Sequence, residues 1–304
     1  MTRIIGSQGV APRVFEGYKD EAPNPHAWKR EEFEERSLVG YQYRPDWSMF
    51  IDGNQSFRQI TTRNSPTVIN AGFSDRLFHD GRAESTFNGF SIFGDFDKRD
   101  VIHRVKTTLR RDAKGQITNE PPIVEIVPVT IAVTNAALAS QAVGPIVNEV
   151  EMSYLGRQFP HVAYKLLAAK VQGFQTVDAT DSVLSRFPVG KQCATCMTYE
   201  DLIKRAFRSE WWNDSGAKDK TPLVLLRGCS TQENPTGSLM EGNFSLYWGL
   251  SIMLYEASLV SNQSPFDEMM RGRPEMVEAK WELVKSKLTQ PIRRDQHVAA
   301  PPCT

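Results

Sequence analysis

The stretch from Thr61 to Asp97 reads TTRNSPTVINAGFSDRLFHDGRAESTFNGFSIFGDFD and packs unusual chemistry into a short, turn-rich segment. A short apolar run at residues 68–71 is followed by Phe73, Leu77 and Phe78. The tetrapeptide HDGR at residues 79–82 comes next, and its Asp and Gly are residues that favour a tight turn. The pattern predicts a buried loop rather than a regular helix or strand.

This segment resembles one in the bacterial di-haem cytochrome c peroxidases, which carry R-N-x-P-x-x-x-N-A followed by F-x-D-G-R-A. A second stretch, SQAVGPIVNEVEM at residues 140–152, is similar to the family's Q-A-x-G-P-x-x-N-x-x-E-M segment beside the peroxidatic haem. A third, LYEASLVSNQSPFD at residues 254–267, is similar to the family's L-x-E-x-x-L-V-S-x-x-x-P-F-D stretch. Three such segments in the family's order, spread over roughly two hundred residues, are far more specific together than any one of them.

The resemblance implies roles for five residues. Glu151 would act as acid and base, taking a proton from the proximal oxygen of hydrogen peroxide and delivering it to the departing one, while Gln141 would line the same distal pocket. Arg82 would pair with a haem propionate. His79 stands where the family commonly has a tryptophan between its two haems, so that electron path is in question here. Asn70 would contribute to the family's calcium site.

The residue types alone allow plainer interpretations of the same positions. Asn148 is a good N-cap, and Glu151 three residues later can complete a capping-box-like pair at the start of a helix. A histidine in an apolar loop such as His79 is often a hydrogen-bonded core residue, and Arg82 could be a surface arginine after a turn. The third segment is explained by a core helix and a capped turn at residues 264–267.

The sequence departs from the family at the haem attachment sites. A c-type haem needs two thiols and an axial histidine in C-x-x-C-H, and the nearest string here is CATCM, from Cys193 to Met197. It could be a chance pair, a redox pair or a metal pair, and Cys229 with His161 could complete a zinc site. The chain therefore resembles the middle of a longer peroxidase. It would then hold neither of the family's two haem c groups and would lack activity alone.

Composition excludes several classes of function. The 304 residues are 40% hydrophobic, which is enough for a sizeable core. Lys plus Arg and Asp plus Glu are 36 each, so no net charge favours nucleic acid or an anionic membrane. The N-terminus lacks the apolar core of a signal peptide, and no run approaches a membrane span. A periplasmic location is implied only by the resemblance.

Periodicity predicts a mainly α fold, namely a cytochrome-c-like helical domain with long loops and room for one small β-hairpin. The hairpin is expected within residues 101–133, around the charged turn at residues 110–115. Helices are expected at residues 135–143, 149–171, 199–212, 243–260 and 274–288. The helix from Asn243 is apolar on more than one face, which predicts a central, buried position. We expect an extended arm at residues 1–60, the helical domain at 61–272, and a helix and tail at 273–304.

Three functions follow from these observations. The first is a portion of a di-haem peroxidase that reduces hydrogen peroxide with electrons from a small cytochrome or cupredoxin. The second is a haem-free relative that keeps the scaffold to bind a partner or ligand, as a monomer or a homodimer. The third is a thiol oxidoreductase that uses Cys193 and Cys196, which lacks the βαβ pattern usual around such a pair.

Overall fold

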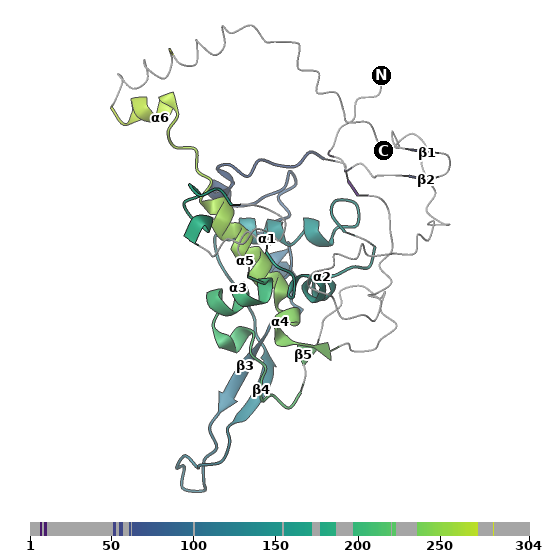
Figure 1. Ribbon diagram of the computed structural model, residues 1–304, viewed down its shortest axis with the longest axis vertical. Coiled ribbons are helices and arrows are strands. Elements are labelled where there is room, and N and C mark those ends of the chain that lie inside the picture. The colour runs from purple at the N-terminus through teal and green to yellow at the C-terminus, as the bar shows by residue number, and fades with distance from the viewer. Residues whose placement is uncertain are drawn as a thin grey trace. The chain divides into compact units, whose positions relative to one another are not determined.

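The computed structural model describes residues 7, 9–10, 51–52, 55–56, 61, 63–99, 101–153, 155–171, 177–186, 197–219, 221–222, 236–272 and 282. The chain divides into two compact units, residues 1–258 and residues 259–304. Figure 1 shows both units, and of the elements below only α6 belongs to the second.

Helices make up 34% of the described residues and strands 13%. The α-helices are α1 (Ala137–Ala142), α2 (Phe159–Leu166), α3 (Tyr199–Ala206), α4 (Leu239–Gly242), α5 (Phe244–Ala257) and α6 (Pro265–Met270). Single 3-10 turns form η2 (Ala71–Phe73), η3 (Gly94–Phe96), η4 (Pro145–Val147), η5 (Leu184–Arg186) and η6 (Ser209–Trp211). Long loops join these elements. The cytochrome-c-like arrangement of the helices stays a prediction.

The predicted β-hairpin is present. Strands β3 (His103–Thr108) and β4 (Ile123–Pro128) pair antiparallel, with His103 opposite Pro128 and Thr108 opposite Ile123. The charged turn beyond them is closed by Asp112, whose Oδ1 accepts the N–H groups of Lys114 and Gln116 at 2.8 and 2.9 Å. Two shorter antiparallel pairs join β1 (Ile51–Asp52) to β2 (Gln55–Ser56) and β5 (Thr221–Pro222) to β6 (Thr236–Gly237).

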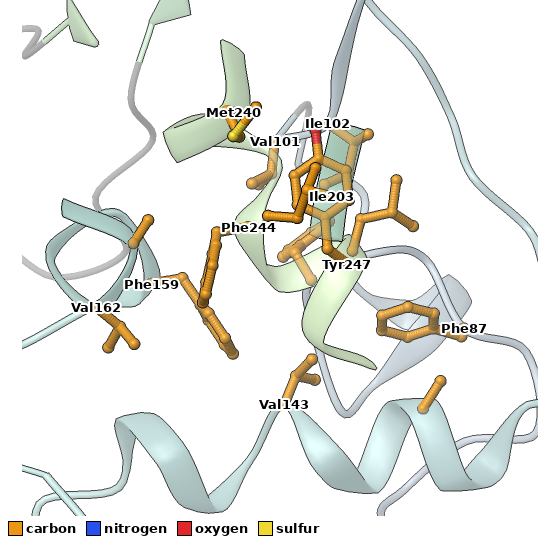
Figure 2. Close-up of a cluster of buried hydrophobic side chains, with 14 of the residues drawn as sticks. Phe87, Val101, Ile102, Val143, Phe159, Val162, Ile203, Met240, Phe244 and Tyr247 are labelled. Carbon is orange, nitrogen blue, oxygen red and sulfur yellow. The ribbon is translucent and has the colours of Figure 1, made fainter. Parts of the chain in front are cut away.

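The core of the first unit forms where α1 crosses α5. The indole Nε1 of Trp248 on α5 donates to the carbonyl oxygen of Ala142 on α1 at 3.0 Å. Phe87 is fully buried beside them, and its backbone exchanges hydrogen bonds of 2.8 and 3.0 Å with Val133. Figure 2 shows Phe87, Phe159, Phe244 and Tyr247 gathering with smaller side chains in this core. Segments from residue 87 to residue 247 thus contribute to a single apolar cluster.

Helix α5 is buried over its first half only. Phe244, Leu246, Tyr247 and Gly249 are buried, as the sequence predicts for a central helix. Leu254 and Tyr255, in contrast, are 68% and 64% exposed. The prediction of a buried helix is therefore wrong for the C-terminal half.

A buried asparagine joins the start of α5 to the hairpin. The side chain of Asn243 is fully buried; its Oδ1 accepts the N–H of His103 at 3.0 Å, and its Nδ2 donates to the carbonyl oxygens of His103 and Trp211 at 2.7 and 2.8 Å. The hydroxyl of Tyr247, one turn along, also donates to the Trp211 carbonyl at 2.6 Å. Burial raises the pKa of that phenol well above its usual range. Residues 103, 211 and 243 are held together by this network.

Two predicted helices are shorter than expected. The helix predicted at 149–171 covers only 159–166: the chain before it forms turns, Gly156 lies in the left-handed region at φ 84°, and Pro160 is in the first turn, where a helix tolerates proline. The helix predicted at 199–212 ends at Ala206, since Phe207 is extended, and only η6 follows. Its start is well specified by a capping box between Thr198 and Asp201.

The described residues include only part of the remaining segments for which the sequence predicts a structure. The predicted helix at 274–288, apart from the helical residue Glu282, and most of the predicted arm at 1–60 lie outside the described residues. The capped turn predicted at 264–267 is confirmed, because Ser264 and Asp267 form a capping box that starts α6. Within the described helices, none is both long and apolar enough to cross a membrane.

Candidate functional site

The site predicted from the sequence draws on two turns, and the structure packs one against the other. Gly144 begins the turn after α1, and a Cβ atom placed on it would lie 3.4 Å from Cζ of Phe78 and 3.1 Å from Cγ2 of Ile92. Leu77 and Ala83, which flank the HDGR tetrapeptide, are buried against Ala137 and Leu138 of α1. The two stretches that carry His79, Arg82, Gln141 and Glu151 are therefore neighbours.

The first turn is a tight loop closed by backbone hydrogen bonds. Leu77 and Ala83 exchange bonds of 3.2 and 3.3 Å, and the N–H of Gly81 donates to the carbonyl oxygen of Phe78 at 3.1 Å. Phe78 has φ 63°, a left-handed conformation that costs a bulky residue roughly 1–2 kcal/mol. Packing of its ring over Gly144 offsets this cost. The pattern F-x-D-G-R signals a turn, but nothing in it predicts the left-handed phenylalanine.

His79 lies at the exposed side of this turn. The interpretation of His79 as a hydrogen-bonded core residue is therefore wrong. More broadly, the predicted buried loop is buried from Phe87 to Ser91, whereas residues 63–70 and 72–76 are exposed. A position for His79 between two haems stays a prediction.

Arg82 is held by an ion pair and a ring stack. Its Nη1 lies 3.1 and 3.0 Å from the two carboxylate oxygens of Asp80, and its guanidinium carbon lies 4.0 Å from the centre of the Phe78 ring. Arg63 approaches the same carboxylate at 2.8 Å. Hydrogen bonds from Arg63 and then Arg82 hold the pKa of the Asp80 carboxyl well below its usual range. An anionic ligand of Arg82 would have to share the guanidinium with Asp80.

Gln141 and Glu151 are both half-buried, on either side of the Gly144 turn. Gln141 is in the last turn of α1, and its carbonyl oxygen accepts the N–H of Gly144 at 3.0 Å. Glu151 follows η4 in a turn rather than in a helix. Asn148 does accept the N–H of Glu151 at 3.1 Å as a cap would, yet the helix predicted to begin there is absent.

A third segment meets this turn from the N-terminal side. The N–H of Val10 donates to the carbonyl oxygen of Val150 at 2.9 Å. Ser7 is bonded to Thr61 through its backbone N–H, which donates to the Thr61 hydroxyl at 2.8 Å. The sequence contains no local signal for these contacts, because they join positions more than fifty residues apart.

The predicted metal positions remain untested or lie outside the described residues. Asn70 is exposed, with φ 61°, at the start of η2, and its part in a calcium site stays a prediction. Cys193, Cys196 and Cys229 lie outside the described residues, and His161 accepts the N–H of Gln158 at 3.1 Å. Within the described ranges, no three His, Cys, Asp or Glu side chains come together as a metal-binding group.

Comparison with protein families identifies the class to which these turns belong. The family model for di-haem cytochrome c peroxidases matches residues 48–208, just over half of the chain. This range contains both turns of the candidate site and ends before α5. The chain belongs to the di-haem cytochrome c peroxidase family. No curated protein and no solved structure matches it.

The residues of this chain do not fit the covalent attachment of haem c, the cofactor that the family name implies. Attachment needs two cysteines followed directly by a histidine, and the sequence contains no C-x-x-C-H. Of the histidines in the described part of the chain, Nδ1 of His103 lies 2.9 Å from the Val101 carbonyl oxygen, His161 is used in a helix cap and His79 follows a phenylalanine. None of the three is the histidine of an attachment motif.

Proposed function

We propose that this chain supplies the proton-handling side of a peroxide-reducing site of the di-haem cytochrome c peroxidase family. The observation that carries the proposal is the packing of the Phe78 turn onto the Gly144 turn inside the region that matches the family. This packing makes neighbours of the two sequence stretches that resemble the family's site. Membership of this family supports a peroxidase activity, which is an oxidoreductase activity, and a relationship to c-type cytochromes.

In this proposal, Glu151 is the acid and base. Its carboxylate takes a proton from one oxygen of hydrogen peroxide and returns it to the other, which leaves as water, and two electrons with two further protons convert the remaining oxygen to a second water. A half-buried carboxylate suits this task, because it is reachable by a small substrate yet partly shielded from bulk water. Gln141 lines the same pocket, and Arg82 offers a guanidinium for an anionic group. A small cytochrome or cupredoxin supplies electrons to the whole enzyme, in the periplasm.

The test begins with the cofactor. The chain, with any in-frame flanking sequence, is produced in a host that matures c-type cytochromes, and its absorption spectrum and its consumption of hydrogen peroxide are recorded. We expect c-type haem bands where the flanking sequence supplies C-x-x-C-H motifs, and in that protein we expect Glu151→Gln to lower peroxide consumption by about a hundredfold, the usual contribution of a general acid–base group. Glu149→Gln is the matched control, because it removes the same charge two residues away. Equal loss in the two variants would overturn the role of Glu151.

The alternative is a haem-free relative that keeps the scaffold to bind a partner or ligand. The absence of a C-x-x-C-H string from the sequence favours it. It predicts a folded protein with no haem bands and no peroxide consumption in the same experiment. The thiol oxidoreductase that would use Cys193 and Cys196 predicts instead thiol-disulfide exchange that is lost in Cys193→Ser.

A further inference from the structure

The turn that carries Glu151 is built around one side chain. Oδ1 of Asn148 accepts two backbone N–H groups, from Val150 at 2.9 Å and from Glu151 at 3.1 Å. The carbonyl oxygen of the same residue accepts the N–H groups of Met152 and Ser153 at 3.1 and 2.9 Å. Four successive N–H groups therefore point at Asn148.

This arrangement replaces the helix that usually fixes a capped glutamate. In a capping box, the following helical turns hold the third residue in place. Here, no helix begins between Asn148 and Phe159 in the described part of the chain, so the bonds to Asn148 and the bond from Val10 to the carbonyl oxygen of Val150 help to hold residues 150–153 in place. The bond from Val10 holds the carbonyl group of Val150. Among the hydrogen bonds of the described residues, the backbone N–H of Glu151 donates only to Asn148.

We propose that Asn148 is the positioning residue of Glu151, fixing the backbone from which the carboxylate reaches its substrate. That the positioned carboxylate acts on a substrate rests on the proposed function. That Asn148 fixes the backbone of Glu151 does not, because it depends only on the two hydrogen bonds to the amide oxygen of Asn148. A residue with an acceptor at the same place, such as serine, can serve the same role, whereas alanine cannot.

The experiment uses nuclear magnetic resonance on the full chain with labelled valine, glutamate and threonine. In Asn148→Ala we expect hydrogen exchange at the Val150 and Glu151 amides to accelerate about fivefold to tenfold, the effect of losing one ordinary hydrogen bond. We also expect the Glu151 side chain to change from one dominant χ1 rotamer to an average of several. Asn148→Ser should restore both measurements. Asn148→Gly serves if the alanine variant does not fold, because glycine also lacks the acceptor yet is well tolerated at caps.

The matched control is Asp178→Ala, which removes a similar bond elsewhere: Oδ1 of Asp178 accepts the N–H of Thr180 at 2.8 Å. It should accelerate exchange at Thr180 and leave Glu151 unchanged. Unchanged exchange and an unchanged Glu151 rotamer in folded Asn148→Ala or Asn148→Gly would overturn the inference. Failure of the proposed function has a different signature, since Glu151→Gln would then consume peroxide like the unmodified chain whatever the Asn148 variants do.

Discussion

Gly249 on α5 lies so close to Phe87 that a Cβ atom there would be 2.6 Å from Cζ of the phenylalanine ring. The same Cβ atom would lie 3.1 Å from the carbonyl oxygen of Ala139 on α1. Because Phe87 is fully buried in a closely packed core, its ring can move only by displacing the side chains around it. Glycine at this position is what allows α1, α5 and Phe87 to approach one another.

We therefore expect Gly249→Ala to lower the free energy of unfolding by about 1–3 kcal/mol, the usual cost of overpacking, despite the better helix propensity of alanine. Denaturant unfolding measures the change. Gly72→Ala is the control, because a Cβ atom there would make only ordinary contacts of 3.6–4.0 Å. A Gly249→Ala protein as stable as the original would show that the helices can separate without cost.

Asn243 should be among the most sensitive positions. Asn243→Ala removes three hydrogen bonds and leaves the His103 N–H and the carbonyl oxygens of His103 and Trp211 without this partner. We expect a loss of about 3 kcal/mol or more, since each buried backbone group left unsatisfied costs about 1–3 kcal/mol. Thermal unfolding and hydrogen exchange in β3 both report it. Tyr247→Phe, which removes a single hydroxyl bond to the same Trp211 carbonyl, should cost only about 1 kcal/mol.

At Ser140, in contrast, we expect a substitution to raise the free energy of unfolding. Its side chain is fully buried on α1, and its hydroxyl has no hydrogen-bond partner within the described part of the chain. Ser140→Ala removes a desolvated hydroxyl and improves helix propensity, so the free energy of unfolding should rise by about 0.5–1 kcal/mol. Ser238→Ala, which removes the N-cap of α4, should instead cost about 1 kcal/mol. A loss at Ser140 would reveal a bound water or ligand at its hydroxyl.

His161 should make the chain sensitive to acid. Burial, and then the charge of Arg157, lower the pKa of His161 to about 4 in the folded chain, whereas an unfolded histidine titrates near 6.5. The folded state therefore favours neutral His161. This contribution to stability is complete above pH 6.5 and is lost progressively as the pH falls toward about 4.

His161→Gln should flatten that part of the stability profile, because glutamine can still cap the helix but does not titrate. Melting temperatures measured from pH 7 to pH 4 test this. His79→Gln, at an exposed position, should keep the acid sensitivity of the original chain. An unchanged slope in His161→Gln would refute the assignment to this residue.

The sequence predicted local features better than their extent or surroundings. The β3–β4 hairpin and the Ser264–Asp267 cap were predictable, because alternation, turn residues and capping chemistry act over a few positions. Family membership was predictable because it depends on matching strings. The helix expected after Asn148 contains Pro160, a residue tolerated only in the first turn of a helix, and Gly156 before it is left-handed, so these two residues were local signals of the later start at Phe159.

Features that depend on distant contacts could not be predicted. Three features depend on segments that only the whole fold brings together. They are the left-handed conformation of Phe78, which packs against Gly144, the approach of Phe87 to Gly249, and the bond from Val10 to Val150. His79 is exposed, whereas Leu77 and Ala83 are the residues of that turn that pack against α1, and residue types alone do not distinguish these positions. Site residues were identified by resemblance, and their roles stay predictions.

The bond between His103 and Asn243 also has a consequence for biosynthesis. The two residues are 140 positions apart, so a ribosome adding about 5–20 residues per second needs roughly 7–28 seconds to make the anchor after the first strand has emerged. During that interval, the β3–β4 ribbon lacks the bonds from Asn243 to His103. Among the described strands, β3 and β4 pair only with each other, so the exposed, positively charged Arg104 and Lys106 on β3 discourage wrong pairing with other chains both before and after α5 arrives.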